Sequence, residues 1–541
     1  TGERSTLTPI PRNYSVTSLA FISELIWDQP LKKPGPNISL IPYTAADLTR
    51  DFEDPSQKSS ISNVNIGGDA KIALSSSLNL DLTFNPDFSQ VEVDEQVTNL
   101  NRFELFFPEK RQFFLENADL FSRFGHPRYA RTFFSRRIGI ARDTINDINI
   151  QNKILYGARL SGKLDNNWRV GLLNMQTEKK ESIFLPSNNY TVAVIERKIF
   201  GRSNIGAMFT NKQSFDGDNE SNDFTGDNFN RVLCLEYNIA TNDNKWNGKV
   251  TYQKSWDNEK QPGEAAFSGY LNYDSRTLKW GWSHSWNGDN FNSEMGFVPR
   301  QGFFRIRPTI GYNFYPKNGK VTQHELELLN ETFWIEDRKS DHIFSLTDEI
   351  NFKNTAKLEI SLVQDYTYLF DDFDPTNTDG AELIADSDYT YNSLGFEFAS
   401  DFRKKISYIF EGSAGKYFNG ERYNIGGSIN MRFQPYASIK LNADYNKILM
   451  PSPFTSADIW LIGPRIDLTF TKKLFLASFL QFNSQSENFN VNTRLQWRFK
   501  PVSDLFIVYT DNYATEDMSG RFDFQKKNRA LVVKMTYWLN I

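Results

Sequence analysis

Residues 488–500 read NFNVNTRLQWRFK, a run in which apolar and polar side chains alternate one by one. One face of this run carries Phe489, Val491, Thr493, Leu495, Trp497 and Phe499. The other face carries only Asn, Arg, Gln and Lys. Because successive side chains of a β-strand point to opposite faces, the pattern predicts a strand with one apolar and one wet face. That combination is typical of the wall of a transmembrane β-barrel.

The same alternation recurs along most of the chain after about Ile38. It is clear in residues 423–433 and 437–445, whose polar faces again carry Asn, Arg, Lys and Asp. A soluble propeller or a pair of β-sandwiches also alternates in this way. The alternation therefore predicts an all-β protein and leaves these architectures open.

Composition favours the membrane barrel. Of the 541 residues, 39% are hydrophobic and 15% are aromatic, and the mean hydropathy is −0.53. No apolar run approaches 18 residues, which excludes a membrane-spanning helix. A barrel wall explains the many rings, because aromatic side chains gather at both membrane interfaces. The net charge of −5 argues against a nucleic-acid partner.

The connections between the predicted strands alternate between tight and long. Tight connections are expected at 201–203, 242–244, 317–320, 354–355, 434–435, 471–473 and 501–503. Long ones are expected at 179–188, 213–227, 258–263, 288–301, 371–388, 448–457 and 514–526. Membrane barrels have short periplasmic turns and long external loops, whereas a soluble sandwich has no reason to keep this asymmetry.

These observations predict a large antiparallel up-and-down barrel over residues 36–541. About 21 strands follow Gln151, and three more fit near 38–46, 63–74 and 77–85. The total is about 24, within a range of roughly 22 to 26, and an even count places both termini on the periplasmic side of an outer membrane. Residues 1–35 are predicted to be a linker.

Residues 86–150 break the strand pattern. They are dense in charge and in Phe, and we expect them to fold into the lumen as a plug or constriction, without hairpins. Partly buried charges need partners. The predicted network joins Glu92, Asp94, Glu104, Glu109 and Glu116 to Arg102, Lys110, Arg111, Arg136 and Arg137, or to residues of the wall.

The same segment carries a family resemblance. NPDFSQVEVDEQVTNLNRFELFFPEKRQFFLEN at 85–117, followed by FFSRRIG at 133–139, resembles the hallmark stretch of a widespread, poorly characterised Bacteroidota family. The resemblance implies an N-terminal domain similar to carbohydrate-binding family 9, joined to an outer-membrane barrel. Residues 1–35 match only the trailing edge of that first domain, so its sugar binding is not carried onto residues here.

The last strand is expected to bear an assembly signal. Its outward residues are Val533, Met535, Tyr537, Leu539 and Ile541. An aromatic, alternating terminal strand resembles the signal that the barrel-assembly machinery reads. Expected partners are therefore this machinery, outer-membrane lipid and lipopolysaccharide, and other outer-membrane or lipoprotein subunits.

Residues that carry catalytic or metal chemistry are sparse. His126, His284, His324 and His342 lack the spacing of a metal site, and Cys234 reads as a small buried residue. Asp216, Asp218 and Glu220 are weak Ca²⁺ candidates, because Ser221 stands where an EF-type loop needs glycine. No nucleophile-elbow, phosphate-loop or dinucleotide motif is present. We therefore expect no cofactor and no enzymatic activity.

Three functions stay open at this point. The first is an anchor or accessory subunit of an outer-membrane assembly. The second is a plugged or gated pore for polar solutes such as oligosaccharides, and the third is an outer-membrane hydrolase. The first is preferred, because the insert looks built to stay packed.

Overall fold

The computed structural model forms one closed antiparallel sheet. The structure describes residues 6–11, 14, 17–23, 25–29, 37–54, 59–89, 93–143, 148–215, 228–258, 261–516 and 522–541. The sheet has 25 strands, of which β29 (Leu539–Asn540) continues β28 (Phe522–Thr536) alongside β1 (Ile38–Asp51). Counting β28 and β29 as one wall strand leaves 24. The predicted barrel and its strand number are therefore confirmed.

The remaining wall strands follow one another in chain order. They are β2 (Ile61–Ala73), β3 (Leu78–Phe84), β8 (Ile154–Lys163), β9 (Trp168–Thr177), β10 (Ser187–Ile199), β11 (Ser203–Phe215), β12 (Phe229–Ala240), β13 (Trp246–Trp256), β14 (Ala265–Asp274), β15 (Leu278–Asn287), β16 (Phe303–Phe314), β17 (Val321–Ile335), β18 (Arg338–Phe352), β19 (Lys357–Tyr368), β20 (Asp388–Ala399), β21 (Ile406–Tyr417), β22 (Gly420–Phe433), β23 (Ala437–Leu449), β24 (Ala457–Thr471), β25 (Leu474–Asn483), β26 (Asn488–Lys500) and β27 (Ser503–Glu516).

The ring closes where β1 pairs with β28, from Tyr43 opposite Thr536 to Asp51 opposite Asn528. Alternation decides which side chains face the lumen. In β26, Asn490 and Asn492 are buried inside, while Trp497 is exposed on the outside. Among the described residues, no helix is long and apolar enough to cross a membrane.

The strand connections differ in length between the two ends of the barrel. At one end the turns are short, as at 164–167, 200–202 and 501–502, and the start of β1 lies at this end. The other end carries longer connections such as 288–302 and 369–387. The predicted alternation fails three times, because 336–337, 418–419 and 484–487 are tight turns at the long-connection end. Glu336 and Phe418 adopt positive φ there, which lets a two-residue turn close.

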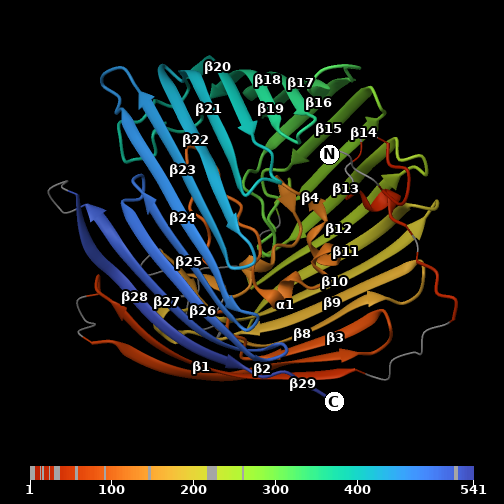
Figure 1. Ribbon diagram of the computed structural model, residues 1–541, viewed down its shortest axis with the longest axis vertical. Helices are drawn as coiled ribbons and strands as arrows, with labels where there is room; N and C mark the ends of the chain where they lie inside the picture. Colours follow the sequence, from red (N-terminus) through yellow and green to blue (C-terminus); the bar gives the residue numbers. More distant parts are fainter. Residues whose placement is uncertain are drawn as a thin grey trace.

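Residues 85–153, which we call the luminal insert, leave the wall after β3 and return to it at β8. Figure 1 shows α1 and β4 of this insert inside the ring of strands. Its elements are α1 (Gln112–Leu115), α2 (Ala118–Ser122), β4 (Gly125–His126), β5 (Ala130–Arg131), the 3-10 turn Ser135–Arg137, β6 (Ile140–Asp143) and β7 (Ile148–Gln151). Two further 3-10 turns lie outside it, at Leu19–Phe21 and Glu181–Ile183.

The expectation that this segment holds no hairpins was wrong. β4 pairs with β5, and β6 pairs with β7. Gly125, with φ of 83°, supplies a backbone conformation that other residues rarely adopt. Strands this short carry too few residues for an alternating pattern to be visible in the sequence.

Candidate functional site

An apolar patch on the inner face of the barrel anchors the luminal insert. This wall patch consists of Leu173 and Met175 on β9, Tyr190, Val192 and Val194 on β10, Met208 on β11 and Cys234 on β12, each at most 5% exposed. The insert covers it with Phe114, Leu120, Phe121, Phe124 and Phe133. In a water-filled lumen these apolar surfaces would stay wet, so their burial favours a docked insert.

Glycines in the wall leave room for the rings of the insert. A Cβ atom on Gly171 would lie 2.8 Å from Cζ of Phe121, and one on Gly206 would lie 2.9 Å from Cζ of Phe124. Any larger side chain at these positions would displace a ring. The wall and the insert are therefore complementary in shape as well as in polarity.

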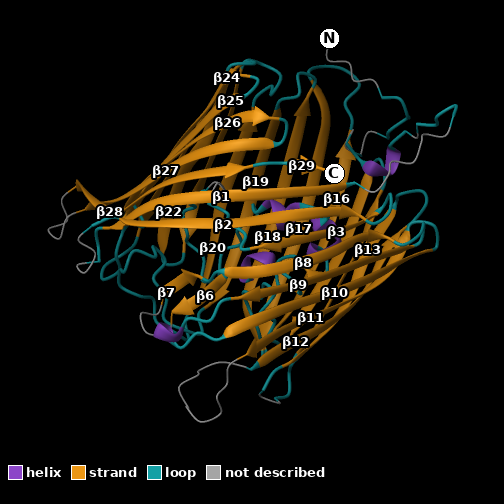
Figure 2. Ribbon diagram, turned by 90° about the horizontal axis from the view of Figure 1, so that it is seen from below, coloured by secondary structure: helices purple, strands orange, loops and turns teal. Residues whose placement is uncertain are grey.

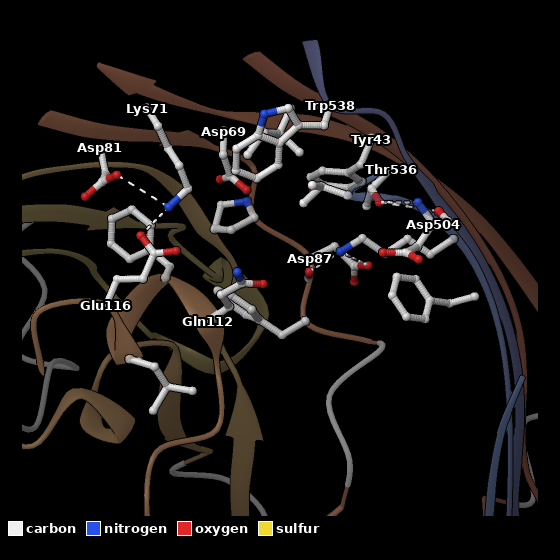
Figure 3. Close-up of a pocket in the computed structure, with 18 of the residues that line it drawn as sticks. Tyr43, Asp69, Lys71, Asp81, Asp87, Gln112, Glu116, Asp504, Thr536 and Trp538 are labelled. Carbon is white, nitrogen blue, oxygen red and sulfur yellow. Dashed lines mark hydrogen bonds and ion pairs between the residues drawn. The ribbon is translucent and has the colours of Figure 1, made fainter. Parts of the chain in front are cut away.

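A buried arginine ties the insert to two wall strands. Arg159 on β8 is 2% exposed in its side chain, and its Nη2 lies 2.6 Å from Oδ2 of Asp81 on β3. It also donates to the backbone carbonyl of Phe113 and lies 3.5 Å from Oε2 of Glu116. Lys71 on β2 bridges the same two carboxylates, as Figure 3 shows. Glu116 of the predicted network thus pairs with residues of the wall.

The other predicted charges pair mostly within the insert. Asp94 lies 3.3 Å from Nζ of Lys110 and accepts a 3.0 Å hydrogen bond from Nη1 of Arg136. Oε2 of Glu109 accepts a 2.7 Å hydrogen bond from Nη2 of Arg111. The remaining pairs are Glu104 with Arg137 at 2.7 Å and Arg102 with Asp341 of β18. Glu92 lies outside the described residues.

Two of these carboxylates titrate below their ordinary range. Burial raises the pKa of Asp94 and of Glu109, but hydrogen bonds and positive charge outweigh burial, so both pKa values are lowered. The cations are Arg136 and Lys110 for Asp94, and Arg111 for Glu109. Both groups therefore stay ionised and paired at neutral pH.

The lowered pKa values predict how docking depends on pH. Ionised Asp94 and Glu109 stabilise the docked insert fully above their unfolded pKa values of about 3.9 and 4.3. This stabilisation is lost as the pH falls through their lower pKa values in the native state. We expect no leak between pH 7 and about pH 5, and a reversible rise in bilayer conductance below about pH 4. Asp94→Asn should conduct more than wild type at pH 7 and converge with it in acid. Identical pH profiles would contradict this role for Asp94.

The insert also reaches the opposite side of the bore. Near the closure of the ring, Nζ of Lys534 on β28 lies 3.2 Å from Oδ2 of Asp87. Gln485, between β25 and β26, accepts from the backbone N–H of Asn99 at 2.9 Å and donates to its carbonyl at 2.7 Å. Since the wall patch belongs to β9–β12, the insert spans the lumen from one wall to the other.

Two cavities flank the insert. The first, of about 660 Å³, lies where the ring closes and is called the seam cavity. Figure 3 shows acidic and basic side chains that line it. They include Asp69, Lys71, Asp81, Asp87, Glu116, Asp504 and Lys534. Apolar side chains such as Phe88, Phe113 and Trp538 also line this cavity, and Lys71 and Lys534 are paired with its carboxylates.

The second cavity, of about 780 Å³, lies toward the long-connection end and is called the aromatic cavity. Its rings are Phe103, Phe106, Tyr129, Phe297, Phe333, Phe373, Tyr391, Tyr417 and Phe418. Its charged side chains are Arg102, Arg128, Arg131, Arg300, Glu104, Glu331, Asp341 and Asp365. Asp341 pairs with Arg300 at 2.8 Å as well as with Arg102. Ring faces beside fixed charges are typical of ligand sites.

The four histidines lie on different elements: β4 of the insert carries His126, β15 carries His284, β17 carries His324 and β18 carries His342. His126 lies in the insert, and burial together with nearby cations, Arg305 first among them, lowers its pKa to about 3. Nδ1 of His324 lies 3.1 Å from Oδ2 of Asp348, beside the outward-facing Phe314.

The Ca²⁺ candidates Asp216, Asp218 and Glu220 lie outside the described residues. Asp374, in another acidic stretch, instead accepts the backbone N–H groups of Thr376, Thr378 and Gly380.

The terminal residues of the predicted assembly signal line the outside of the closure. Val533, Met535, Leu539 and Ile541 are exposed, and Tyr537 stacks on Phe499 at 6.4 Å. Between them, Lys534 is buried and Trp538 lines the seam cavity. The alternation expected for this strand is therefore present.

The wall patch was not predicted from the sequence. Its strands are apolar on both faces, as in the neighbours Leu172 and Leu173 or Met208 and Phe209. In each pair one side chain is exposed on the outside and the other is buried under the insert. Most other strands of the chain alternate between apolar and polar residues. The apolar residues on both faces of these strands were therefore the sequence signal for a covered inner face.

Comparisons with known proteins identify a family. No curated protein matches this chain. Among solved structures, the siderophore receptor PirA from Pseudomonas aeruginosa has 9% identity and a TM-score of 0.43, over 94% of this chain and 81% of that chain. The ferric yersiniabactin uptake receptor FyuA from Yersinia pestis has 8% identity and a TM-score of 0.37, over 94% and 81%. The family profile described as a domain of unknown function, DUF5916, matches residues 34–474, so the chain belongs to that family.

Proposed function

We propose that this protein is a closed, non-enzymatic outer-membrane barrel that serves as an anchor or accessory subunit of a larger assembly. The luminal insert is its plug, and the end with tight turns, which carries both ends of the barrel, faces the periplasm. The observation that carries the proposal is the wall patch under the insert. A permanently open pore has no use for an apolar inner face and matching rings.

A specific observation supports a second candidate, a plugged or gated pore for polar solutes such as oligosaccharides. The aromatic cavity lies near the long-connection end, and the seam cavity lies on the other side of the insert. Such a pore would bind its solute in the aromatic cavity and pass it along the insert to the seam cavity. The pore hypothesis requires the luminal insert to move.

Bilayer conductance separates the two candidates. The proposed function predicts that the purified barrel conducts no steady current, and that replacing residues 93–143 by a short Gly-Ser linker opens a large conductance. The variant is first checked for a heat-modifiable barrel band on a gel. A steady wild-type current would overturn the closed barrel and favour the pore.

Extraction in mild detergent tests the accessory role. We expect the wild-type protein to leave native membranes with at least one other outer-membrane protein or lipoprotein. Recovery of the barrel alone, in every detergent that keeps it folded, would contradict an accessory role. The lack of enzymatic activity is part of the same proposal, and hydrolysis of ester, peptide or glycoside probes by the purified barrel would refute it.

A further inference from the structure

The barrel wall is incomplete beside the half of β2 that lies toward the long connections. The β2–β3 ladder ends at Gly68 opposite Phe84, and the β3–β8 ladder ends at Phe84 opposite Tyr156. On its other side, β2 stays paired with β1 up to Ile61. Within the described part of the chain, residues 61–67 thus have a strand on one side only. In Figure 2, β3 runs beside only part of β2.

The backbone of this segment, which we call the β2 edge, points hydrogen-bonding groups into the gap. Residues of a strand alternate in the side to which they direct N–H and C=O. The carbonyl of Ile66 accepts from Asn85 and the N–H of Leu74 bonds to Leu78, so even-numbered residues face β3. Ser62 and Val64 therefore direct their backbone groups into the gap. Among the described residues, the Asn85 side chain is the one group that hydrogen-bonds to the gap-facing backbone of this edge.

The outward side chains of the β2 edge are in register with exposed apolar side chains of β28. Val64 is in register with Ala46 and, through it, with Val533 on β28, and Ile66 is likewise in register with Met535. Val64 and Ile66 are 70% and 69% exposed, against 39% for Val533 and 45% for Met535. Val64 and Ile66 are more exposed because no strand flanks β2 on this side among the described residues. Two exposed apolar side chains and open backbone groups therefore lie on the same short stretch of wall.

The chemistry of this edge selects its occupant. Lipid tails can cover Val64 and Ile66 but cannot hydrogen-bond to peptide groups, and unpaired peptide groups within a membrane are costly. A second copy of this chain is a poor partner. Both barrels stand upright in the membrane, and strands tilted by about 40° would cross at about 80°. An extended segment of a different protein satisfies the backbone and the apolar side chains together.

We propose that the β2 edge receives an extended strand of another protein by β-strand addition. This deepens the proposed function, on which it rests, by naming the contact through which an accessory barrel holds a partner. The added strand places apolar residues outward, beside Val64 and Ile66. Its alternate residues are small or polar, because they lie beside Asn63 and Asn65 on the inner side.

A proline at Val64 tests the edge. The N–H of Val64 points into the gap, so Val64→Pro removes a bond to the partner and leaves the β1–β2 ladder intact. Asn65 directs its N–H at β1, so Asn65→Pro is the matched variant that should impair barrel assembly itself. A photo-crosslinking residue replaces Ile66 in cells that express the full chain, and Leu531, outward on the sealed strand β28, is the control position.

We expect a discrete protein adduct from position 66 and none from position 531. Val64→Pro should lower the yield of this adduct by about tenfold, the equivalent of one hydrogen bond, with the heat-modifiable barrel band unchanged. The proposal is overturned if position 66 gives no protein adduct, gives an adduct with a second copy, or gives an adduct that Val64→Pro leaves unchanged.

The two proposals fail in different ways. If a partner co-purifies while position 66 gives no adduct, the accessory role stands and the β2 edge is refuted. If position 66 captures a partner while the barrel conducts steadily, the β2 edge stands and the closed barrel is refuted.

Discussion

Replacing Arg159 by methionine is expected to destabilise the docked insert and the wall beside it by about 3–5 kcal/mol. The variant keeps a side chain of similar length but leaves Asp81, itself buried, with Lys71 at 3.6 Å as its nearest cation. Phe113 and Glu116 lose a donor at the same time. The temperature at which the barrel loses its heat-modifiable band should fall, and the buried Cys234 should become open to alkylation.

Two variants control for this effect. Arg159→Met combined with Asp81→Asn removes the stranded charge and should regain part of the loss. Lys416→Met breaks an exposed pair with Glu421 and should leave the heat-modifiable band and the alkylation of Cys234 as in wild type. If Arg159→Met behaves like Lys416→Met, the buried pair does not hold the insert.

Replacing Phe124 by alanine is expected to weaken docking by about 3–5 kcal/mol, because this ring is 1% exposed against the wall patch. That loss corresponds to a rise of at least about a hundredfold in the alkylation rate of Cys234, if alkylation reports undocking. Phe402→Ala, at a ring 57% exposed in a turn, should change the rate little. An unaltered rate in Phe124→Ala would mean that the ring does not hold the insert down.

Gly206 offers an independent check on the same contact. Gly206→Val should push against the ring of Phe124 and cost about 1–3 kcal/mol. Combined with Phe124→Ala, the valine has room, so the two losses should not add. If the two free-energy losses added fully in the double variant, Gly206 and the ring of Phe124 would not be in contact.

Much of the fold was predictable because a barrel wall repeats one simple pattern. Alternation in stretches such as 488–500 indicated strands, and unequal turn lengths indicated one closed ring. The segment 86–150 stood out because it broke that pattern. The tight turns at 336–337 and 418–419 were not predictable, since they depend on single residues at positive φ.

The site was less accessible to sequence reasoning. The charged residues of the insert could be named, but their partners Lys71, Arg159 and Asp341 lie on wall strands whose register no local pattern reveals. The wall patch was hidden because apolar residues on both faces of β9–β12 look the same in sequence. The gap beside β2 depends on where β3 ends, and strand ends are the least predictable feature of a sheet.

The central claim is that the luminal insert stays docked on the wall patch, and the native cysteine reports on it directly. Cys234 is fully buried in that patch, beside Thr132 of the insert. The decisive measurement is the alkylation rate of Cys234 by a small maleimide in intact outer membranes. The reference is Asn318→Cys in a Cys234→Ala background, because Asn318 lies exposed in the β16–β17 turn. A docked insert predicts a rate at least about a hundredfold below the reference. Equal rates would contradict it.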